Sequence, residues 1–525
     1  MEGAGFKSLI VFLLLAVLAF IAGSLAADSA ASALVPSVCI AGVFLLLYLG
    51  KNAWALVFIV PSVLSVLNFD VLQKVPVGQL MGGVVLVYLL LLATMGHIRL
   101  KWNSISYFDV ALLIFYIYFF YGWVRNPVTL RQFTSITDYG YDQQLGGTCY
   151  IWGVASVFPI LAVSVLEQKL DKLLFVLKIA FWITILVSIF SVFRSYGELV
   201  SSGEEKTGFG ESRVGVFYVV GRNIITFLLC QSSFFGVLLS PWKLAIALVA
   251  CAGIMWSGFR LQLLLLACNV IWVAYFTRQL LWLFLLLLFS WGAVVYLSYQ
   301  VDFDELPPTV RRVATMIPGV KVNKNKVGDA YGSIDWRLKM WALAADPSSG
   351  YIKDYTWGDG FAYSLYRERI RVTADAFGLI DLKGDYRYYA ATGGWHSGVI
   401  EMIHRTGFVG LTLVLWLCIA TLCMTYTVCK YMPKVKNRTY GLFYCVSIVS
   451  GIAYTLVERG YTELFNSVLF NAAITKMLYC SLRREGYFIT VKGRKYYVPL
   501  LMQEETSPAA AMQETNKALS AKINA

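Results

Sequence analysis

The sequence predicts an all-α polytopic membrane protein with about 14 transmembrane helices and one large loop between helices 11 and 12. Hydrophobic residues make up 58% of the 525 positions and charged residues 14%, which lies outside the usage of soluble globular domains. Apolar runs of about 20 residues, the length that crosses roughly 30 Å of hydrocarbon as a helix, recur along the chain. Both observations favour a membrane protein.

The apolar runs define the individual spans. The predicted spans are 6–27, 33–50, 53–69, 77–96, 107–124, 148–166, 173–193, 222–240, 242–258, 261–277, 279–299, 398–429, 440–457 and 463–482. The first span ends in Ser24-Leu25-Ala26-Ala27, which is typical of a signal-peptide cleavage site. Because Glu2 offsets Lys7 and the apolar stretch is longer than usual, we expect an uncleaved anchor.

The short connections between spans predict the orientation. Basic residues gather in alternate connections and at the start of the tail, at Lys51, Arg99, Lys101, Lys169, Lys172, Lys243, Arg278, the run 430–438, Arg483 and Arg484. Because basic residues in short connections mark the cytoplasmic side, both termini are predicted to be cytoplasmic. The segments 125–147, 194–221 and 301–397 then lie on the outer side.

The chain divides into four predicted units. They are a bundle of the first eleven spans at 1–300, a periplasmic loop domain at 301–397, the last three spans at 398–482 and a cytoplasmic tail at 483–525. In the loop domain, Ser333 to Ala345 is expected to form an amphipathic helix. In the tail, alternating residues on either side of Lys492-Gly493-Arg494 predict a β-hairpin.

Several functional classes are disfavoured by the composition and by missing motifs. The formal net charge is +13, but the basic residues lie in short segments between spans, which argues against nucleic-acid binding. The chain has no P-loop, no dinucleotide-binding glycine motif, no HExxH and no GxSxG. The outer carboxylates Asp302, Asp304 and Glu305 have no metal-ligand spacing with His. We therefore predict neither a metal nor a cofactor.

The chain has three His residues. His97, beside Arg99 at a predicted inner membrane edge, is expected to be an interfacial residue. His396 ends the long outer loop at the mouth of the next span, and His404 follows it. If this stretch is helical, the two imidazoles share one face about two turns apart. Without further context, such a pair would be expected to be interfacial as well.

The residues around His396 carry a longer pattern. His396-Ser397 is followed after nine residues by Gly407 and after two more by Gly410. Three further elements precede it, in chain order Arg213-Val214-Gly215-Val216-Phe217 with Arg222-Asn223, Ser257-Gly258-Phe259-Arg260, and Arg337-Leu338-Lys339-Met340-Trp341 with Gly358-Asp359-Gly360. This ordered set resembles the O-antigen ligase and O-antigen polymerase superfamily of bacterial envelopes. Ser397, where the family most often has Asn, and Arg405, at a position often acidic there, depart from the family's pattern.

The resemblance implies a metal-independent inverting glycosyltransferase at the periplasmic face of the bacterial inner membrane. Its donor is a glycan linked to undecaprenyl diphosphate, and its acceptor is a hydroxyl of lipid A-core or of another glycan. Guanidinium groups bind diphosphate oxygens without a metal, and a neutral His orients or deprotonates the acceptor. The resemblance assigns this last role to His396, with support from Glu401 and His404. It assigns substrate binding to Arg213, Arg260, Arg337, Arg222 and Asn223.

Other interpretations stay open at this stage. The predicted topology places these arginines and His396 on the outer side, where snorkelling to lipid phosphates is the competing role for an arginine. Within the superfamily, the pattern is closer to a ligase than to a polymerase of O-antigen, capsule or exopolysaccharide. A flippase or transporter of lipid-linked sugars is the alternative from another class, and a structural assembly partner is the third. An internal repeat, which transporters often have, is not visible in the sequence.

Overall fold

The computed structural model describes about three fifths of the chain. The described residues are 105–127, 148–165, 169–201, 215–256, 260–300, 319–320, 328–361, 390, 394–491 and 494–497, with a few positions in 85–93. The predicted spans 6–27, 33–50 and 53–69 and nearly all of 77–96 lie outside these residues. Arg213 and most of the predicted loop domain 301–397 also lie outside them.

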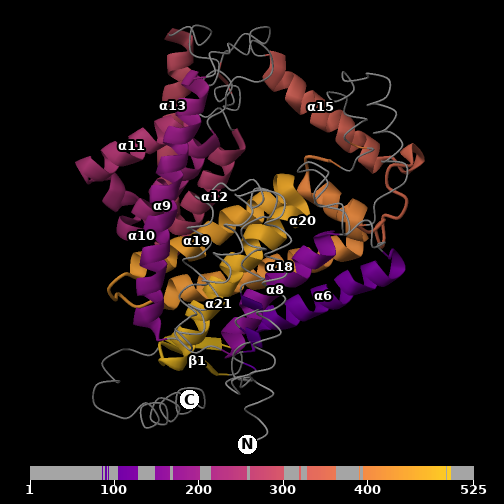
Figure 1. The fold of residues 1–525 in the computed structure, drawn as a ribbon. Coiled ribbons are helices and arrows are strands. Elements are labelled where there is room, and N and C mark those ends of the chain that lie inside the picture. Colours follow the sequence, from indigo (N-terminus) through magenta and orange to yellow (C-terminus); the bar gives the residue numbers. More distant parts are fainter. Residues whose placement is uncertain are drawn as a thin grey trace, which may run out of the picture.

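The described residues are almost entirely helical (Figure 1). The α-helices are α6 (Tyr107–Arg125), α8 (Thr148–Val165), α9 (Leu170–Ser201), α10 (Gly215–Leu238), α11 (Pro241–Trp256), α12 (Arg260–Phe276), α13 (Leu280–Gln300), α15 (Gly328–Ala345), α18 (Gly398–Tyr431), α19 (Arg438–Tyr454), α20 (Gly460–Glu463) and α21 (Leu469–Arg484). Three short segments depart from α-helical geometry. They are the 3-10 helix η5 (Pro347–Ser349) and the π-helical turns η7 (Thr455–Arg459) and η8 (Leu464–Val468). The strands are β1 (Phe488–Val491) and β2 (Arg494–Tyr497).

Within the described residues, four helical runs are long and apolar enough to cross a membrane. They are Tyr107–Arg125, Leu280–Gln300, Gly398–Tyr431 and Arg438–Arg484. A fifth is obtained if Tyr218–Leu238 and Pro241–Ile254, which are bent by 113° at a short break, count as one span. The prediction of about 14 spans is therefore not supported. One physical reason is length, because the 16 residues of α11 rise only about 24 Å at about 1.5 Å each.

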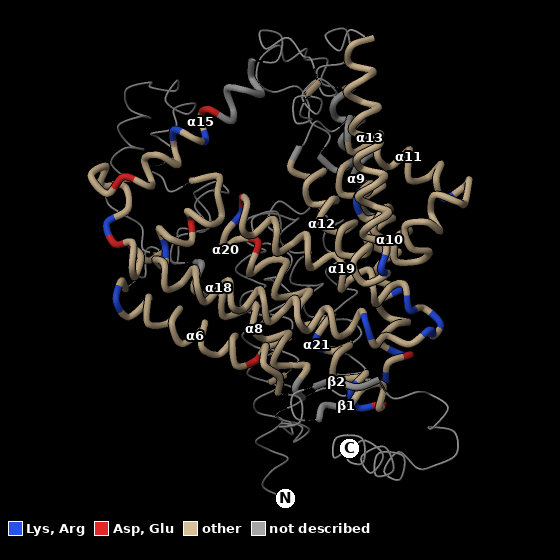
Figure 2. The backbone as a smooth tube through the Cα atoms, turned by 180° about the vertical axis from the view of Figure 1, so that it is seen from behind, with Lys and Arg blue, Asp and Glu red and all other residues tan. Residues whose placement is uncertain are grey.

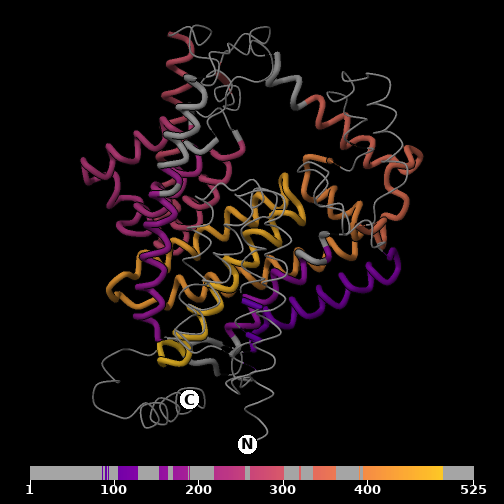
Figure 3. The backbone as a smooth tube through the Cα atoms, in the orientation of Figure 1, coloured from indigo at the N-terminus to yellow at the C-terminus, as the bar shows by residue number. Residues whose placement is uncertain are grey.

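The last helical run, Arg438–Arg484, folds back on itself at its middle (Figure 3). The Thr475 hydroxyl of α21 lies 3.8 Å from the Cys445 sulfur of α19, although 30 residues separate them. Gly451 of α19 likewise faces Val468 of η8. The turn is made by Gly460, which has a φ of +46° that glycine adopts without steric cost. The predicted spans 440–457 and 463–482 thus form a helical hairpin, whose tip consists of η7 and α20.

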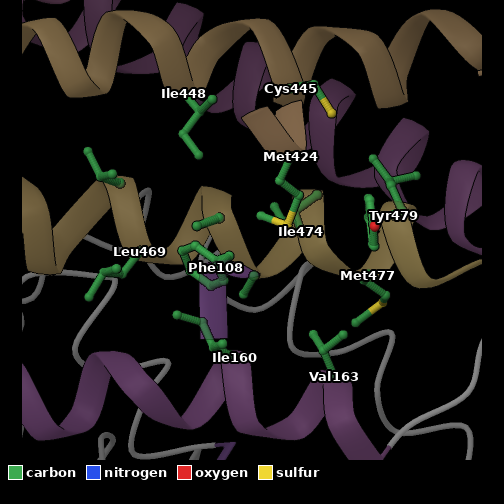
Figure 4. Close-up of a cluster of buried hydrophobic side chains, with 14 of the residues drawn as sticks. Phe108, Ile160, Val163, Met424, Cys445, Ile448, Leu469, Ile474, Met477 and Tyr479 are labelled. Carbon is green, nitrogen blue, oxygen red and sulfur yellow. The ribbon is translucent and has the colours of Figure 1, made fainter. Parts of the chain in front are cut away.

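This hairpin and α18 form the centre of the bundle. Helices α6 and α8 pack on one side of it, and α9, α10 and α12 pack on the other (Figure 1). The interior is apolar, with Phe108 of α6 and Ile160 of α8 facing Leu469 and Ile474 of α21 (Figure 4). On the opposite face of α6, the side chain of Val124 is 75% exposed. A helix with large apolar side chains on its outer surface fits a lipid environment.

One ion pair lies inside this apolar interior. The Lys476 ammonium of α21 bonds the Asp109 carboxylate of α6 and also reaches the Ile160 carbonyl oxygen at 3.4 Å. Asp109 in turn accepts hydrogen bonds from the backbone N–H and the hydroxyl of Ser106, which caps α6. A buried charge needs such partners because an unpaired one is costly to desolvate. The pair therefore fixes α21 against the first turn of α6.

The β-hairpin predicted in the tail, after α21, is confirmed. Strands β1 and β2 are antiparallel, with Phe488 opposite Tyr497 and Val491 opposite Arg494. The fully buried Phe488 ring packs on Tyr431, the last residue of α18, at a centroid distance of 5.3 Å. Figure 2 shows that basic residues gather at this end of the bundle. Lys430 lies in the last turn of α18, Arg438 begins α19, and Arg483 and Arg484 lie in the last turn of α21. The opposite end, around α15 and α20, has charges of both signs.

Helix α18 is broken near its start, and a loop fills the break. Gly407 has φ +67° and ψ −175°, which interrupts the helix. The backbone N–H groups of Phe408 and Val409, freed by the interruption, donate to the carbonyl oxygens of Tyr355 and Thr356 at 2.8 and 3.2 Å. The loop 351–361 is thus joined to α18 by main-chain hydrogen bonds, much as a strand is joined to its neighbour.

The Tyr118→Phe substitution is expected to lower stability modestly. The Tyr118 hydroxyl donates to the Thr406 carbonyl oxygen at 2.7 Å, beside the break in α18. A hydrogen bond of this kind contributes about 0.5–1.5 kcal/mol to the free energy of unfolding. Thermal denaturation of the purified protein in detergent measures the effect. Tyr121→Phe, whose side chain is 47% exposed on the same helix, is the control. Equal midpoints for the two variants would show that the Tyr118 bond does not stabilise the break.

Candidate functional site

Charged residues gather at the tip of the α19–α21 hairpin. Glu458 and Arg459 lie in η7, and Glu463 ends α20. Each of these side chains is half-buried. Charges at such a depth in an apolar bundle are costly and typically mark a functional site, and π-helical turns are frequent at such sites. The tip is therefore the natural centre of a candidate site.

Arg222 of α10 joins this tip from the side. Its guanidinium donates to the Gln262 side-chain oxygen of α12 at 3.1 Å, and it lies close enough to Glu463 for the two charges to interact. Glu463 also interacts with Arg459. Arg459 in turn donates from Nε to the Tyr454 hydroxyl at 3.2 Å. Arg222 and Arg459 thus both lie within electrostatic range of the Glu463 carboxylate.

His396 approaches the same tip from the segment before α18. Its Nδ1 lies 3.9 Å from Glu458 Oε1, and the two side chains are 38% and 23% exposed. The imidazole also packs edge-on against Trp336 of α15, with ring centroids 5.4 Å apart. The backbone of His396 has a φ of +44°, a left-handed conformation that costs a non-glycine residue about 1–3 kcal/mol. Such strain in a partly exposed His beside a carboxylate is typical of functional sites.

Arg337 completes the cluster from α15. It lies one residue after Trp336 and close enough to Glu458 to stabilise the negative charge of that carboxylate, together with His396 and Arg459. The cluster therefore combines one imidazole, two carboxylates and three guanidinium groups. They come from α10, α15, the segment before α18, and the hairpin tip. We call these six residues, Arg222, Arg337, His396, Glu458, Arg459 and Glu463, the tip cluster.

Two glycines allow α18 to approach the hairpin tip. A Cβ on Gly398 would lie 1.7 Å from the Thr455 carbonyl oxygen, and one on Gly460 would lie 2.4 Å from the Glu401 carboxylate. Any larger side chain at either position would force the segments apart. The close contact places Glu401, in the first turn of α18, and His396, just before the helix, against the tip.

The structure brings together some of the predicted site residues but not all. Arg222, Arg337 and His396 belong to the tip cluster, and the buried Glu401 lies beside Gly460. Asn223 follows Arg222 on α10 and is half-buried. Arg260 begins α12, but its side chain lies outside the described part, and Arg213 lies wholly outside it. The roles predicted for these two arginines stay predictions.

His404 does not share a face with His396, in contrast to the expectation for a continuous helix. Helix α18 begins only at Gly398, with Ser397 as its N-cap, so His396 precedes the helix. The buried His404 instead accepts a hydrogen bond at Nδ1 from the Trp395 indole at 3.0 Å. Its Nε2 lies 3.4 Å from Asp359 Oδ2. The two histidines therefore have different neighbours and, by implication, different roles.

Asp359 is held as a carboxylate in this arrangement. Burial raises the pKa of Asp359, but the hydrogen bond from His404 and those from the backbone N–H groups of Lys353 and Asp354 outweigh it. The pKa of Asp359 consequently lies below its ordinary value. Its own backbone N–H donates to the His404 carbonyl oxygen at 2.8 Å. Asp359 thus fastens the loop 351–361 to the first segment of α18 in two ways.

Glu458, Arg459 and Glu463 were not predicted as site residues from the sequence. Glu458 and Arg459 fall in a short connection between two predicted spans, where charged residues are ordinary. The signal that would have identified them is the shortness of this connection, because a tight turn between two long apolar runs keeps its charged residues beside the spans, where ionisable residues are rare and functional. The pairing of Trp395 with His404 is not predicted either, because the two residues lie on either side of the helix start, and no local pattern indicates how the segment before a helix folds against it.

Comparison with known families and with curated proteins does not identify this site. No model of a known protein family matches the chain, and no curated protein matches it. In the part of the chain that the structure describes, no group of three or more His, Cys, Asp or Glu side chains is placed to hold a metal ion. The expected absence of a metal stays a prediction.

Proposed function

We propose that this chain is a metal-independent inverting glycosyltransferase of the bacterial inner membrane. It transfers a glycan from undecaprenyl diphosphate to an acceptor hydroxyl at the periplasmic face. The most favoured form is O-antigen ligase-like, with lipid A-core as the acceptor. A polymerase of O-antigen, capsule or exopolysaccharide has the same donor and the same chemistry. In this proposal the chain has about 14 spans, with both termini in the cytoplasm and the tip cluster facing the periplasm.

The observation that carries the proposal is the pairing of His396 with Glu458 beside Arg337 and Arg459. The chemistry requires one group that accepts or directs a proton and several cations that bind a diphosphate. His396 supplies the first, because an imidazole exchanges a proton near neutral pH. Arg337, Arg459 and Arg222 supply fixed positive charge, and guanidinium groups match phosphate oxygens in bidentate fashion. Arg213 and Arg260 are proposed as further diphosphate ligands.

The proposed step is a single displacement at the anomeric carbon. The acceptor oxygen forms a bond to this carbon as the bond to the diphosphate oxygen breaks, and the proton of the acceptor hydroxyl passes to His396. Undecaprenyl diphosphate leaves with the electron pair of the broken bond. Guanidinium groups fixed beside the leaving group stabilise the charge that develops on it. Attack on the face opposite the leaving group inverts the anomeric configuration.

Glycan transfer in proteoliposomes tests the proposal. The purified chain is supplied with a defined lipid-linked glycan and with lipid A-core or a second lipid-linked glycan, with and without EDTA. A new glycosidic bond that forms in both conditions supports the proposal, and the acceptor that is consumed separates ligase from polymerase. Movement of the carrier lipid across the bilayer without a new bond would contradict it.

The Glu458→Gln substitution is expected to lower kcat roughly tenfold. Glutamine keeps the size of the side chain but loses the negative charge 3.9 Å from His396, and a factor of ten corresponds to about 1.4 kcal/mol of transition-state stabilisation. Glycan transfer at saturating donor measures the effect. Glu485→Gln is the control, since Glu485 accepts a hydrogen bond from the Leu170 N–H at 2.7 Å at the other end of the bundle. A kcat equal to that of the control would show that Glu458 does not contribute to catalysis.

A flippase or transporter of lipid-linked sugars is the second candidate. Transporters often use discontinuous helices with ionisable residues beside the breaks. The break of α18 at Gly407 and the bend of 113° between α10 and α11 favour this candidate, as do the charges at the hairpin tip. Against it, transport does not require a His-carboxylate pair beside fixed cations. The proteoliposome experiment distinguishes the two, because only the transferase makes a glycosidic bond.

A further inference from the structure

A chain of hydrogen bonds leads from the loop 351–361 to the residue next to His396. It begins at Asp359, passes through His404 and ends at Trp395, with heavy-atom distances of 3.4 and 3.0 Å. All three groups are well shielded, because the side chains of His404 and Asp359 are 7% and 20% exposed and Trp395 is 1% exposed. Nothing in the proposed displacement step uses them.

The donors in this chain fix the state of His404. An indole N–H only donates, so His404 Nδ1 has to accept from Trp395 and carries no proton. The proton of a neutral imidazole then lies on Nε2, where it points to the ionised Asp359. A doubly protonated His404 would place an N–H against the indole N–H. The geometry therefore requires one neutral tautomer.

Trp395 connects this chain to both sides of the candidate site. Its carbonyl oxygen accepts a hydrogen bond from the Trp341 indole of α15 at 3.3 Å. Its ring packs in a buried cluster with Met340 and Ala344 of the same helix. His396 follows directly, with its strained φ of +44° and its ring against Trp336. Fixing the Trp395 indole therefore limits where the His396 backbone and imidazole can lie.

We propose that His404 is a positioning residue, which acts through Trp395 to hold His396 beside Glu458. Asp359 selects the tautomer of His404 in which Nδ1 accepts from the Trp395 indole. The proposal rests on the transferase function proposed above, where His396 handles the acceptor proton. It accounts for a buried Asp-His-Trp chain that lies next to the tip cluster but outside it.

Two substitutions of His404 separate its two bonds. In His404→Asn the amide oxygen lies near the position of Nδ1 and still accepts from Trp395. In His404→Gln the amide nitrogen lies near Nε2 and still donates to Asp359, but the bond to Trp395 is lost. We expect His404→Asn to keep most of the parent's kcat and His404→Gln to lose about tenfold. The KM for the donor is expected to stay unchanged in both variants, because in this proposal His404 does not contact the substrate.

A double-mutant cycle tests whether the effect runs through Trp395. Trp395→Phe keeps an aromatic ring but removes the indole N–H, so it is expected to lower kcat as much as His404→Gln. The double variant is expected to be no worse than either single variant, since both remove the same bond. Trp182→Phe, which removes an indole bond to the Tyr440 hydroxyl at 3.0 Å elsewhere in the bundle, is the control. Independent losses that add in the double variant would overturn the proposal.

Nitrogen-15 NMR provides a readout that does not depend on activity. The chain has only three histidines, so protein labelled with ¹⁵N-histidine in lipid nanodiscs gives few signals, assigned with His404→Asn and His396→Gln. The expected result is an unprotonated, hydrogen-bonded Nδ1 on His404. Trp395→Phe is expected to shift the signals of both His404 and His396, and Trp182→Phe to shift neither. A protonated Nδ1 on His404, or His396 signals that do not respond to Trp395→Phe, would overturn the proposal.

The two proposals fail in different ways. If the parent makes no glycosidic bond but Trp395→Phe shifts the His396 signals, the transferase function is wrong and the coupling of His404 to His396 holds. If the parent transfers glycan but His404→Gln has the kcat of the parent, the positioning role is wrong and the transferase function holds. The parent's NMR spectrum decides the tautomer even if a variant does not fold.

Discussion

The His396→Gln substitution is expected to lower kcat for glycan transfer by roughly 10²–10⁴-fold, the usual contribution of a general base. Glutamine keeps a polar side chain near Glu458, whose Oε1 lies 3.9 Å from Nδ1 in the parent, but it cannot take up a proton. It also removes the imidazole ring that packs against Trp336. The substitution thus tests proton transfer by His396 alone, because the positive charge of the neighbouring arginines is left in place.

The measurement is the initial rate of transfer in proteoliposomes at matched amounts of folded protein. His97→Gln, at a position that the sequence places at the other membrane edge, is the control for loss of a histidine and is expected to match the parent. Donor binding by His396→Gln is expected to be close to that of the parent, since the arginines supply it. A loss of less than a few-fold in kcat would mean that His396 neither accepts nor directs the proton.

The Gly407→Ala substitution is expected to have the largest effect on stability. The backbone at Gly407, with φ +67° and ψ −175°, is in a region that is essentially restricted to glycine and costs other residues about 1–3 kcal/mol. A Cβ there would also lie 2.1 Å from the Thr356 carbonyl oxygen, and such overpacking costs about 1–3 kcal/mol more. The break in α18 would close, or the loop 351–361 would detach from it.

Thermal denaturation in detergent and glycan transfer measure the two consequences together. Gly292→Ala is the control, because a Cβ at this position of α13 meets nothing within 4 Å. It is expected to keep or slightly raise stability, since alanine favours a helix by about 1 kcal/mol over glycine. If Gly407→Ala denatures at the same temperature as the control, the break is not a required feature of the fold.

The break in α18 shows what a local pattern leaves out. The spacing of His396, Gly407 and Gly410 is visible in the sequence, and periodicity predicts one continuous helix from it. The helix starts at Gly398, as the predicted span 398–429 does, but it breaks at Gly407, because the loop 351–361 supplies main-chain partners for the freed N–H groups. Those partners are about 50 residues away in the sequence. No local pattern indicates that they return to this helix.

The sequence by itself determined the class of the protein, much of its helical content and several members of the site. Apolar runs of about 20 residues are the length that a membrane-spanning helix requires, and alternation around Gly493 was enough to specify the β-hairpin, because both signals are local. The same locality accounts for the recognition of His396, Arg337 and Arg222 as unusual residues in short patterns. It does not place them next to one another.

Only the tertiary structure decided what these residues contact. The sharp turn at Gly460 carries Glu458 and Arg459 to the tip of a hairpin, and the glycine at position 398 lets α18 approach that tip. The pairing of His396 with Glu458 joins residues 62 positions apart, and that of His404 with Asp359 joins residues 45 apart. Contacts across such separations depend on how helices pack, which depends on side-chain volume at many positions together. Half of the tip cluster, Arg222, Arg337 and His396, is thus visible in the sequence, whereas the other half and the geometry of the whole depend on the fold.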